Sequence, residues 1–185
     1  LKNKSIMYLS WIIPTYNEER RIEKTIREVE TYLKAKNFEY EIIVADSASR
    51  DRTREIVNKL AAEFKSVRLV EVENRGKGYA VKSGMLAAYG DVRLFSDADN
   101  STAPSYFDAM APFFQKGFDV VISSRDPKDA KGATRDVKEP WYREILGRAG
   151  NLVIQTFGVW GIWDTQNGFK AFTKKAAGDI FSRQT

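Results

Sequence analysis

Strand-sized apolar runs alternate with helix-patterned segments along almost the whole 185-residue chain. The first strand is predicted at residues 8–13, where a short apolar run is closed by Pro14. A helix is expected at residues 18–36, because apolar residues from Ile22 to Leu33 recur at helical spacing behind an acidic first turn. This alternation predicts an α/β fold: a doubly wound, mostly parallel sheet with helices on both faces.

The same pattern continues toward the C-terminus. Strands are predicted at residues 41–45, 67–72, 92–95, 119–123 and 168–172, and helices at 53–64, 79–89, 105–114 and 142–157. Residues 41–45 resemble a strand buried on both faces, whereas the charged residues within 67–72 place that strand nearer an edge. We expect Thr53 to cap its helix, Gly90 to end the helix at 79–89, and Pro112 to end 105–114 early. Residues 126–140 are polar and aperiodic, which predicts a mobile loop.

Cysteine and histidine are both absent from the chain. Disulfides, thiolate metal ligands and Ser-His or Cys-His nucleophiles are therefore excluded. Catalysis would have to use carboxylates, Lys or Arg, Tyr, hydroxyl groups or a hard metal ion. The formal charge of +5 is compatible with phosphate ligands or an anionic membrane face and is too small to indicate nucleic acid. No apolar run approaches the roughly 20 residues that a membrane-spanning helix needs.

Polar and charged residues follow the ends of five predicted strands. In parallel sheets these ends form the rim where ligands bind. The segments are Pro14-Thr15-Tyr16-Asn17-Glu18, Asp46, Asn74-Arg75-Gly76-Lys77-Gly78, Asp97-Ala98-Asp99 and Ser124-Arg125. Their positions predict one ligand site at this rim.

Asp97 and Asp99 could offer oxygens to one Mg²⁺ or Mn²⁺ ion, which is usually held by one or two carboxylates and ligand phosphates. Such a cation would bridge a diphosphate and neutralise it as it leaves. The alternative is a plain turn, because Asp and the following Asn100 favour turns.

The glycines of residues 74–78 would let the backbone approach a phosphate, with Arg75 and Lys77 adding positive charge near a helix N-terminus. The alternative is a glycine-rich turn with solvated bases. The spacing is not that of a P-loop, and no G-x-G-x-x-G follows the first strand, so a Rossmann or flavodoxin-like cofactor site is disfavoured.

The other rim residues have plausible ligand contacts. Tyr16 could lie beside a base and Glu18 could accept from it, while Asn17 could also cap the next helix. Asp46 could contact a base or a ribose, or could belong to a turn. Arg125 is the basic residue that we place on the rim. The patch from Trp160 to Trp163 is interpreted as core packing, with a membrane contact as the alternative.

Together these motifs resemble the family 2 glycosyltransferases of GT-A fold. The likeness is to polyprenyl-phosphate or dolichyl-phosphate glycosyltransferases, with the glucosyl branch closest. The segments that carry it are Ile12-Ile13-Pro14-Thr15-Tyr16-Asn17-Glu18-Glu19, residues 46–53, residues 74–78 with Gly84-Met85, Phe95-Ser96-Asp97-Ala98-Asp99, Ser123-Ser124-Arg125 and Asp164-Thr165-Gln166-Asn167-Gly168-Phe169-Lys170. Ser47 stands where many relatives have a second Asp, and Asn167 replaces a frequent Cys.

The resemblance implies a single GT-A domain over residues 1–185, with a nucleotide-sugar half at 1–100 and an acceptor-side half at 101–185. It implies nucleotide-binding residues Pro14, Tyr16, Glu18, Asp46, Lys77 and Asp97, metal ligands Asp97 and Asp99, catalytic residues Asp99, Arg125 and Asp164, and acceptor-side residues Arg125, Gln166 and Lys170. The membrane-associated C-terminal part of many relatives is expected to be missing here.

The function so implied is metal-dependent, inverting transfer of glucose or mannose from a UDP- or GDP-sugar to a polyprenyl or dolichyl phosphate. The expected location is cytoplasmic, peripheral to the cytoplasmic face of a membrane, with no nucleic-acid partner. An acceptor phosphate is largely a dianion at neutral pH, so it needs no general base.

Three other functions remain open. The first is transfer to a hydroxyl acceptor in polysaccharide synthesis, with Asp164 or Asp126 as the base. The second is a non-catalytic nucleotide-sugar-binding domain. The third is a nucleotidyltransferase, which would release pyrophosphate instead of a nucleoside diphosphate.

Overall fold

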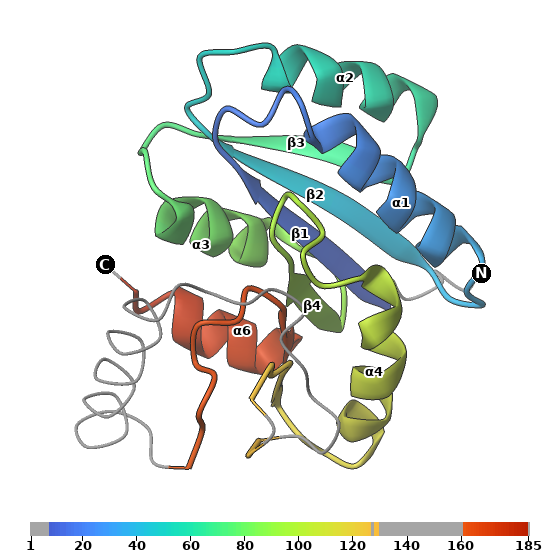
Figure 1. Cartoon of the computed structure of the whole chain (residues 1–185), viewed down its shortest axis with the longest axis vertical. Helices are drawn as coiled ribbons and strands as arrows, with labels where there is room; N and C mark the ends of the chain where they lie inside the picture. The colour runs from blue at the N-terminus through green and yellow to red at the C-terminus, as the bar shows by residue number, and fades with distance from the viewer. Residues whose placement is uncertain (1–7, 127, 130–160, 185) are drawn as a thin grey trace, which may run out of the picture. The chain divides into compact units, whose positions relative to one another are not determined.

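The computed structural model describes residues 8–126, 128–129 and 161–184 (Figure 1). The chain divides into two compact units. The first, here called the sheet unit, comprises Leu1–Val121 and Gly168–Thr185. The second unit is Ile122–Asn167. The predicted division at residue 100 is a functional one and stays a prediction.

The sheet unit is built around six strands in the order β3-β2-β1-β4-β6-β5. Their bounds are β1 Leu9–Thr15, β2 Tyr40–Ser47, β3 Val67–Val72, β4 Val92–Phe95, β5 Val120–Ile122 and β6 Lys170–Thr173. β1 pairs in parallel with β2 and β4, β2 pairs in parallel with β3, and β6 runs antiparallel to β4. The mostly parallel sheet is confirmed, as is the edge position of β3.

Helices cover both faces of this sheet (Figure 1). They are α1 Ile22–Lys34, α2 Thr53–Glu63, α3 Lys77–Ala87, α4 Phe107–Gln115 and α6 Lys174–Phe181, with a 3-10 turn at Pro104–Tyr106. One apolar cluster joins the sheet to α1, α2 and α4, and a second joins its other face to α3 and α6. The doubly wound prediction is confirmed.

Trp11 of β1 is the largest residue at the centre of the first cluster and is fully buried. The rings of Tyr32, Phe107 and Phe169 approach its indole edge-on, at centroid distances of 6.1, 6.4 and 5.5 Å. Its Nε1 donates to Ser96 Oγ at 2.8 Å, so its one polar atom has a partner. These contacts fix β1, β4 and the start of β6 against one another.

Helix α3 lies unusually close to the sheet because Gly84 has no side chain. A Cβ at Gly84 would lie 2.5 Å from Ile12 Cγ2 and 3.3 Å from Ala45 Cβ. This close approach brings the first residue of α3, Lys77, to the rim of the sheet.

The predicted starts of two helices, α1 and α2, are corrected. Helix α1 begins at Ile22, four residues later than expected, with Arg21 as its N-cap. Asn17 caps no helix: it has a left-handed φ of 55°, and its Oδ1 accepts from Arg50 N at 2.8 Å. Thr53 is the first residue of α2, and the N-cap is Arg52. The reason is that Thr53 Oγ1 accepts from Glu18 N at 2.8 Å and so serves the neighbouring loop.

Two predicted helix ends are also corrected. Helix α3 ends at Ala87 before an extended Ala88, ahead of Gly90. Pro112 lies inside α4, which continues to Gln115. Pro112 and Asp108 are both exposed, so the carbonyl that loses its helical partner faces water. The predicted helix at 142–157 and most of the predicted loop at 126–140 lie outside the described residues.

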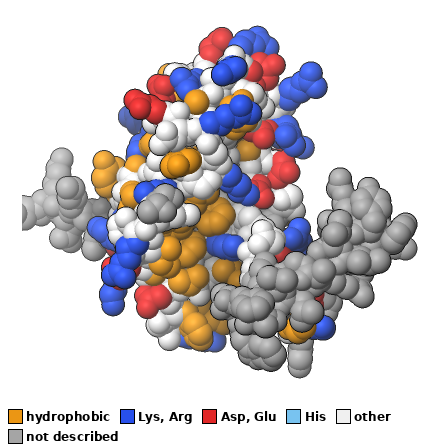
Figure 2. Space-filling model, turned by 90° about the vertical axis from the view of Figure 1, so that its left-hand side faces the viewer, with side chains coloured by type: hydrophobic (Ala, Val, Ile, Leu, Met, Phe, Trp, Pro, Cys, Tyr) orange, Lys and Arg blue, Asp and Glu red, His pale blue; other side chains and the backbone are white. Residues whose placement is uncertain are grey.

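Figure 2 shows hydrophobic side chains gathered on the face of the sheet unit where α3 and α6 lie. The exposed large hydrophobic residues of these two helices are Tyr79, Leu86 and Ile180. Within the part of the chain that the structure describes, no helix is both long enough and apolar enough to cross a bilayer.

Candidate active site

A cavity of about 270 Å³ lies at the carboxyl ends of the central strands. It collects residues from the loops after β1, β2 and β4 and from the start of α3. Its lining consists of Pro14, Thr15, Tyr16, Glu18, Ser47, Lys77, Ala80, Asp97, Ala98 and Asp99. The cavity therefore brings together the predicted metal ligands and every predicted nucleotide-binding residue except Asp46.

The two carboxylates of the Asp-x-Asp motif have different partners. Asp97 Oδ1 forms an ion pair with Lys77 Nζ, and the two side chains are 32% and 57% exposed. Asp99 Oδ1 accepts from Ser101 N at 3.0 Å. Both groups remain accessible from the cavity, so their second oxygens could bind a cation.

Among the described residues no cluster of three or more acidic side chains could hold a metal by itself. A pair of carboxylates facing a phosphate-sized cavity nevertheless fits Mg²⁺ or Mn²⁺, which commonly completes its shell with ligand phosphates and water. The donor set consists of hard oxygens alone, which suits these ions. Lys77 neutralises Asp97 and would compete with a cation that arrives without a phosphate ligand.

Asp46 is fully buried, and its carboxylate is already bound by protein groups. Its Oδ2 accepts from Arg54 Nε at 2.6 Å and from Ser49 N at 3.0 Å. Asp46 does not belong to the cavity lining. Its predicted contact with the nucleotide therefore stays a prediction, and its visible contribution is to hold the loop after β2.

Tyr16 and Glu18 lie at the entrance formed by the loop after β1. The guanidinium carbon of Arg75 lies 4.2 Å from the ring centroid of Tyr16, a cation–π stack that joins this loop to residues 74–78. The Glu18 carboxylate binds Arg21 Nε at 2.9 Å. A planar base entering here would meet a flat surface made by Tyr16 and Arg75.

Left-handed backbone conformations occur in the loops that follow three strands of the sheet. Among the described residues, the non-glycine residues with positive φ are Asn17, Ala48 and Asn100, and they follow β1, β2 and β4. Such conformations cost free energy and persist where surrounding contacts impose them. Asn100 Oδ1 is in addition a buried oxygen without a hydrogen-bond partner. The loops at the rim, where the sequence predicts a ligand, therefore contain conformations that are locally unfavourable in free energy.

Asp51 ties the loop after β1 to the start of α2. Its Oδ2 accepts from Glu19 N at 3.1 Å, and its Oδ1 accepts from Thr53 N at 3.0 Å and Thr53 Oγ1 at 2.5 Å. Burial raises the pKa of Asp51, but these hydrogen bonds outweigh it, so the net pKa is below the usual value.

Asp51→Asn is expected to lower the free energy of unfolding by about 1 kcal/mol at neutral pH, a typical value for a lost helix-start contact. Because the folded pKa is depressed, this contribution is complete above the unfolded pKa of about 3.9 and is lost as pH falls through the folded value. Urea unfolding of both proteins at pH 7 and pH 3 checks this, with Asp179→Asn on exposed α6 as the control. A difference that persists unchanged at pH 3 would contradict the assignment.

The second unit contains Arg125 and Asp164, joined by a bidentate ion pair. Asp164 Oδ2 accepts from Arg125 N and Nε, each at 2.9 Å, and Oδ1 accepts from Nη2 at 3.1 Å. The Asp164 side chain is 3% exposed, whereas that of Arg125 is 49% exposed. Asp129 supports the pair, because its carboxylate accepts from Asp164 N and Trp163 N, both at 2.8 Å.

The remaining predicted acceptor-side residues are Gln166 and Lys170. Gln166 is exposed in the second unit, and Lys170 begins β6 opposite Phe95. Lys128 Nζ lies 3.6 Å from the centroid of the Trp163 ring, which is 37% exposed. Trp160 lies outside the described residues, so the predicted patch is seen only in part.

Two polar lining residues, Thr15 and Ser47, are not among the predicted site residues. Ser47 Oγ donates to Asn74 O at 2.8 Å and accepts from Gly76 N at 2.7 Å, and it thereby positions the loop that precedes Lys77. The sequence signal for Ser47 is its position at the end of β2, directly after Asp46. Thr15 likewise ends β1, directly before Tyr16.

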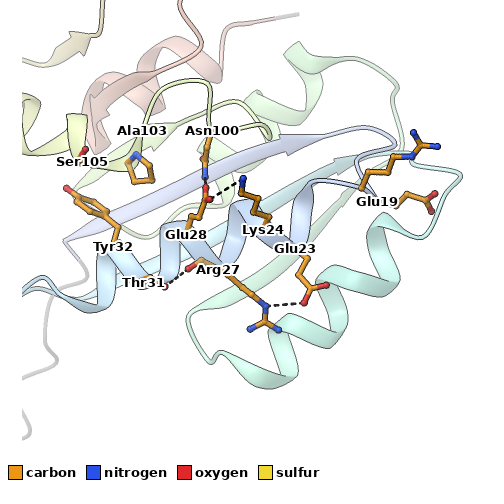
Figure 3. A pocket seen from close by; sticks show the side chains of 12 residues that line it. Glu19, Glu23, Lys24, Arg27, Glu28, Thr31, Tyr32, Asn100, Ala103 and Ser105 are labelled. Carbon is orange, nitrogen blue, oxygen red and sulfur yellow. Dashed lines mark hydrogen bonds and ion pairs between the residues drawn. The ribbon is translucent and has the colours of Figure 1, made fainter. Parts of the chain in front are cut away.

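A larger cavity of about 1000 Å³ lies along α1 (Figure 3). Its lining contains none of the predicted site residues, although Glu19 belongs to the first motif. Some of its lining groups bind one another: Arg27 Nε binds Glu23 at 3.0 Å, and Asn100 Nδ2 donates to Glu28 at 2.8 Å. Asn100, whose buried Oδ1 has no hydrogen-bond partner, also lines this cavity. The predicted metal ligands and nucleotide-binding residues gather in the smaller cavity, which is therefore the better candidate.

Comparison with known proteins identifies the family of this chain. The family model "Glycosyl transferase family 2" matches residues 10–181. A dolichyl-phosphate beta-glucosyltransferase of Trichomonas vaginalis is 36% identical over 193 residues, covering 98% of this chain and 58% of the relative. The corresponding enzyme of Drosophila melanogaster is 36% identical over 199 residues, covering 98% of this chain and 59% of its own.

A solved structure shares the fold. It is glucosyl-3-phosphoglycerate synthase from Mycobacterium tuberculosis in complex with Mn²⁺, UDP and phosphoglyceric acid. It has a TM-score of 0.66 and 22% identity, and the match covers 91% of this chain and 56% of the synthase. This likeness confirms the GT-A fold. The chain spans less than two thirds of the length of these relatives.

Proposed function

This chain belongs to glycosyl transferase family 2, and on that premise we propose that it transfers a hexose from a nucleoside-diphosphate sugar to a polyprenyl or dolichyl phosphate. The observation that carries the proposal is the cavity in which Tyr16, Lys77, Asp97 and Asp99 converge. The names of the relatives favour glucose as the sugar and dolichyl phosphate as the acceptor.

Different residues at and beside the cavity would bind different parts of the donor. Tyr16 and Arg75 offer a flat surface to the base, while Lys77 lies where a diphosphate would meet positive charge. Mg²⁺ or Mn²⁺, when held by Asp97 and Asp99, would neutralise charge on the leaving diphosphate. Lys77 would then exchange its pairing with Asp97 for a contact with phosphate.

In the proposed reaction an oxygen of the acceptor phosphate attacks the anomeric carbon. The bond from that carbon to the diphosphate oxygen breaks, and the nucleoside diphosphate leaves with the electron pair. A single displacement inverts the configuration. The acceptor phosphate carries no proton that must be removed at neutral pH, because its second pKa is about 6.

A hydroxyl acceptor would instead need a base. Asp164 is poorly suited to this, because its carboxylate is buried and bound twice by the Arg125 guanidinium. We therefore assign Asp164 the task of orienting Arg125, and Arg125 that of binding a phosphate. The basic and aromatic pair of Lys128 and Trp163 supports approach to an anionic lipid surface.

The test is a transfer assay with the protein, UDP-glucose or GDP-mannose, and a short polyprenyl phosphate in anionic vesicles. We expect a glucosyl-lipid of inverted configuration, release of nucleoside diphosphate, and loss of the product with EDTA. High salt should weaken vesicle binding, since screening shortens the reach of surface charge. Transfer to soluble hydroxyl acceptors alone, or release of pyrophosphate, would overturn the proposal.

A further inference from the structure

The carboxylate of Asp97 occupies the space in which Gly168 would carry a side chain. A Cβ built on Gly168 would overlap Asp97 Oδ2 and would lie 2.5 Å from Cγ and 2.7 Å from Oδ1. These are its three nearest neighbours, and all belong to the same carboxylate. No residue other than glycine can be accommodated unless Asp97 moves.

The backbone conformation does not explain this glycine. Positive φ values among the described glycines occur at Gly76, Gly117 and Gly161, and Gly168 is not one of them. An L residue could adopt its backbone angles. Space for the carboxylate is therefore the reason for glycine at this position.

Gly168 cannot easily retreat from Asp97. The β4–β6 ladder pairs Phe95 with Lys170, and continuing that antiparallel register by two residues places Gly168 opposite Asp97. The next residue, Phe169, is fully buried, with its ring 5.5 Å from that of Trp11. The anchor in the core and the ladder hold the backbone of Gly168 in place.

We infer that Gly168 is a positioning residue. The Asp97 carboxylate lies in a slot between the backbone of Gly168 on one side and Lys77 on the other, and this slot sets the direction of the carboxylate. The inference rests on the proposed function, in which Asp97 is a ligand of the metal–diphosphate. It assigns part of the metal site to Gly168, whose motif the family resemblance connects only with the acceptor side.

A double-mutant cycle tests the steric part without any ligand. Gly168→Ala should lower the melting temperature in the wild-type background and have little effect in the Asp97→Ala background, where the three clashing atoms are gone. Gly178→Ala on α6, where a Cβ meets nothing within 4 Å, should cause no loss in either background. Equal losses from Gly168→Ala in both backgrounds would overturn the inference.

Calorimetry tests the consequence for the site, using UDP with and without Mn²⁺. Gly168→Ala should weaken the Mn²⁺-dependent part of UDP binding by about 10–100-fold, as displaced supports of metal ligands do, and leave metal-free UDP binding unchanged. An unchanged Mn²⁺ dependence, or equal losses with and without Mn²⁺, would overturn it. If wild-type protein shows no Mn²⁺-dependent binding, the proposed function fails, while the melting cycle still decides whether Gly168 positions Asp97.

Discussion

Asp97→Asn is expected to reduce sugar transfer by about 100- to 1,000-fold, the usual cost of removing one group that stabilises developing charge. The substitution keeps the shape of the side chain in its slot against Gly168 and removes its charge. The lost ion pair with Lys77 lies between partly exposed groups, so its removal costs about 1 kcal/mol of stability or less. The activity should therefore fall without unfolding.

The measurements are initial rates of glucosyl-lipid formation and UDP affinity as a function of Mn²⁺ concentration. Asp99→Asn should abolish the metal dependence of nucleotide binding in the same way. Asp179→Asn, an exposed change on α6, should retain wild-type rates and affinity. Rates within about threefold of wild type for Asp97→Asn, a change of less than 1 kcal/mol in barrier height, would remove Asp97 from the site.

The general architecture could be predicted because it follows from local patterns. A continuous apolar run such as Ile42-Ile43-Val44 is typical of a strand whose two faces are both buried, because consecutive side chains point to opposite faces of the sheet. Strand β2 is buried in this way. Alternation of such runs with amphipathic helices leaves few topologies besides a parallel sheet with two helical layers. The position of the rim residues follows from the same geometry.

Helix boundaries were less predictable because they depend on partners distant in the sequence. Glu18 and Asn17 look like a helix entry, yet Glu18 N donates to Thr53 and Asn17 accepts from Arg50. These contacts across 33 to 35 residues stabilise a turn and delay α1 until Ile22. The tertiary contacts outweigh the local preference.

The side-chain contacts of the site residues could not be predicted from local sequence patterns either. Asp46 is placed at the end of a buried strand as a ligand residue would be, but Arg54, in the first turn of α2, binds its carboxylate. The contact of Gly168 with Asp97 depends on the register between β4 and β6, which lie far apart in the chain. Residue types and spacing identify the candidate groups, and only the folded register determines which of them meet.

Arg125→Ala is expected to reduce transfer to a short polyprenyl phosphate by about 100-fold or more, since a positioned charge on a phosphate contributes several kcal/mol to the transition state. UDP binding should remain within about twofold of wild type, less than 0.5 kcal/mol, because the residues of the donor cavity belong to the sheet unit.

Asp164→Asn should show the same pattern more weakly. The substitution keeps the buried volume and one acceptor oxygen for Arg125 but loses the charge that fixes the guanidinium. Lys175→Ala, an exposed change on α6 that removes a positive charge outside the proposed sites, is the matched control. Kinetics over a range of acceptor concentrations, together with UDP calorimetry, separate the two effects. Equal losses of UDP affinity and transfer in Arg125→Ala would show that Arg125 supports the donor cavity, and the acceptor assignment would then be wrong.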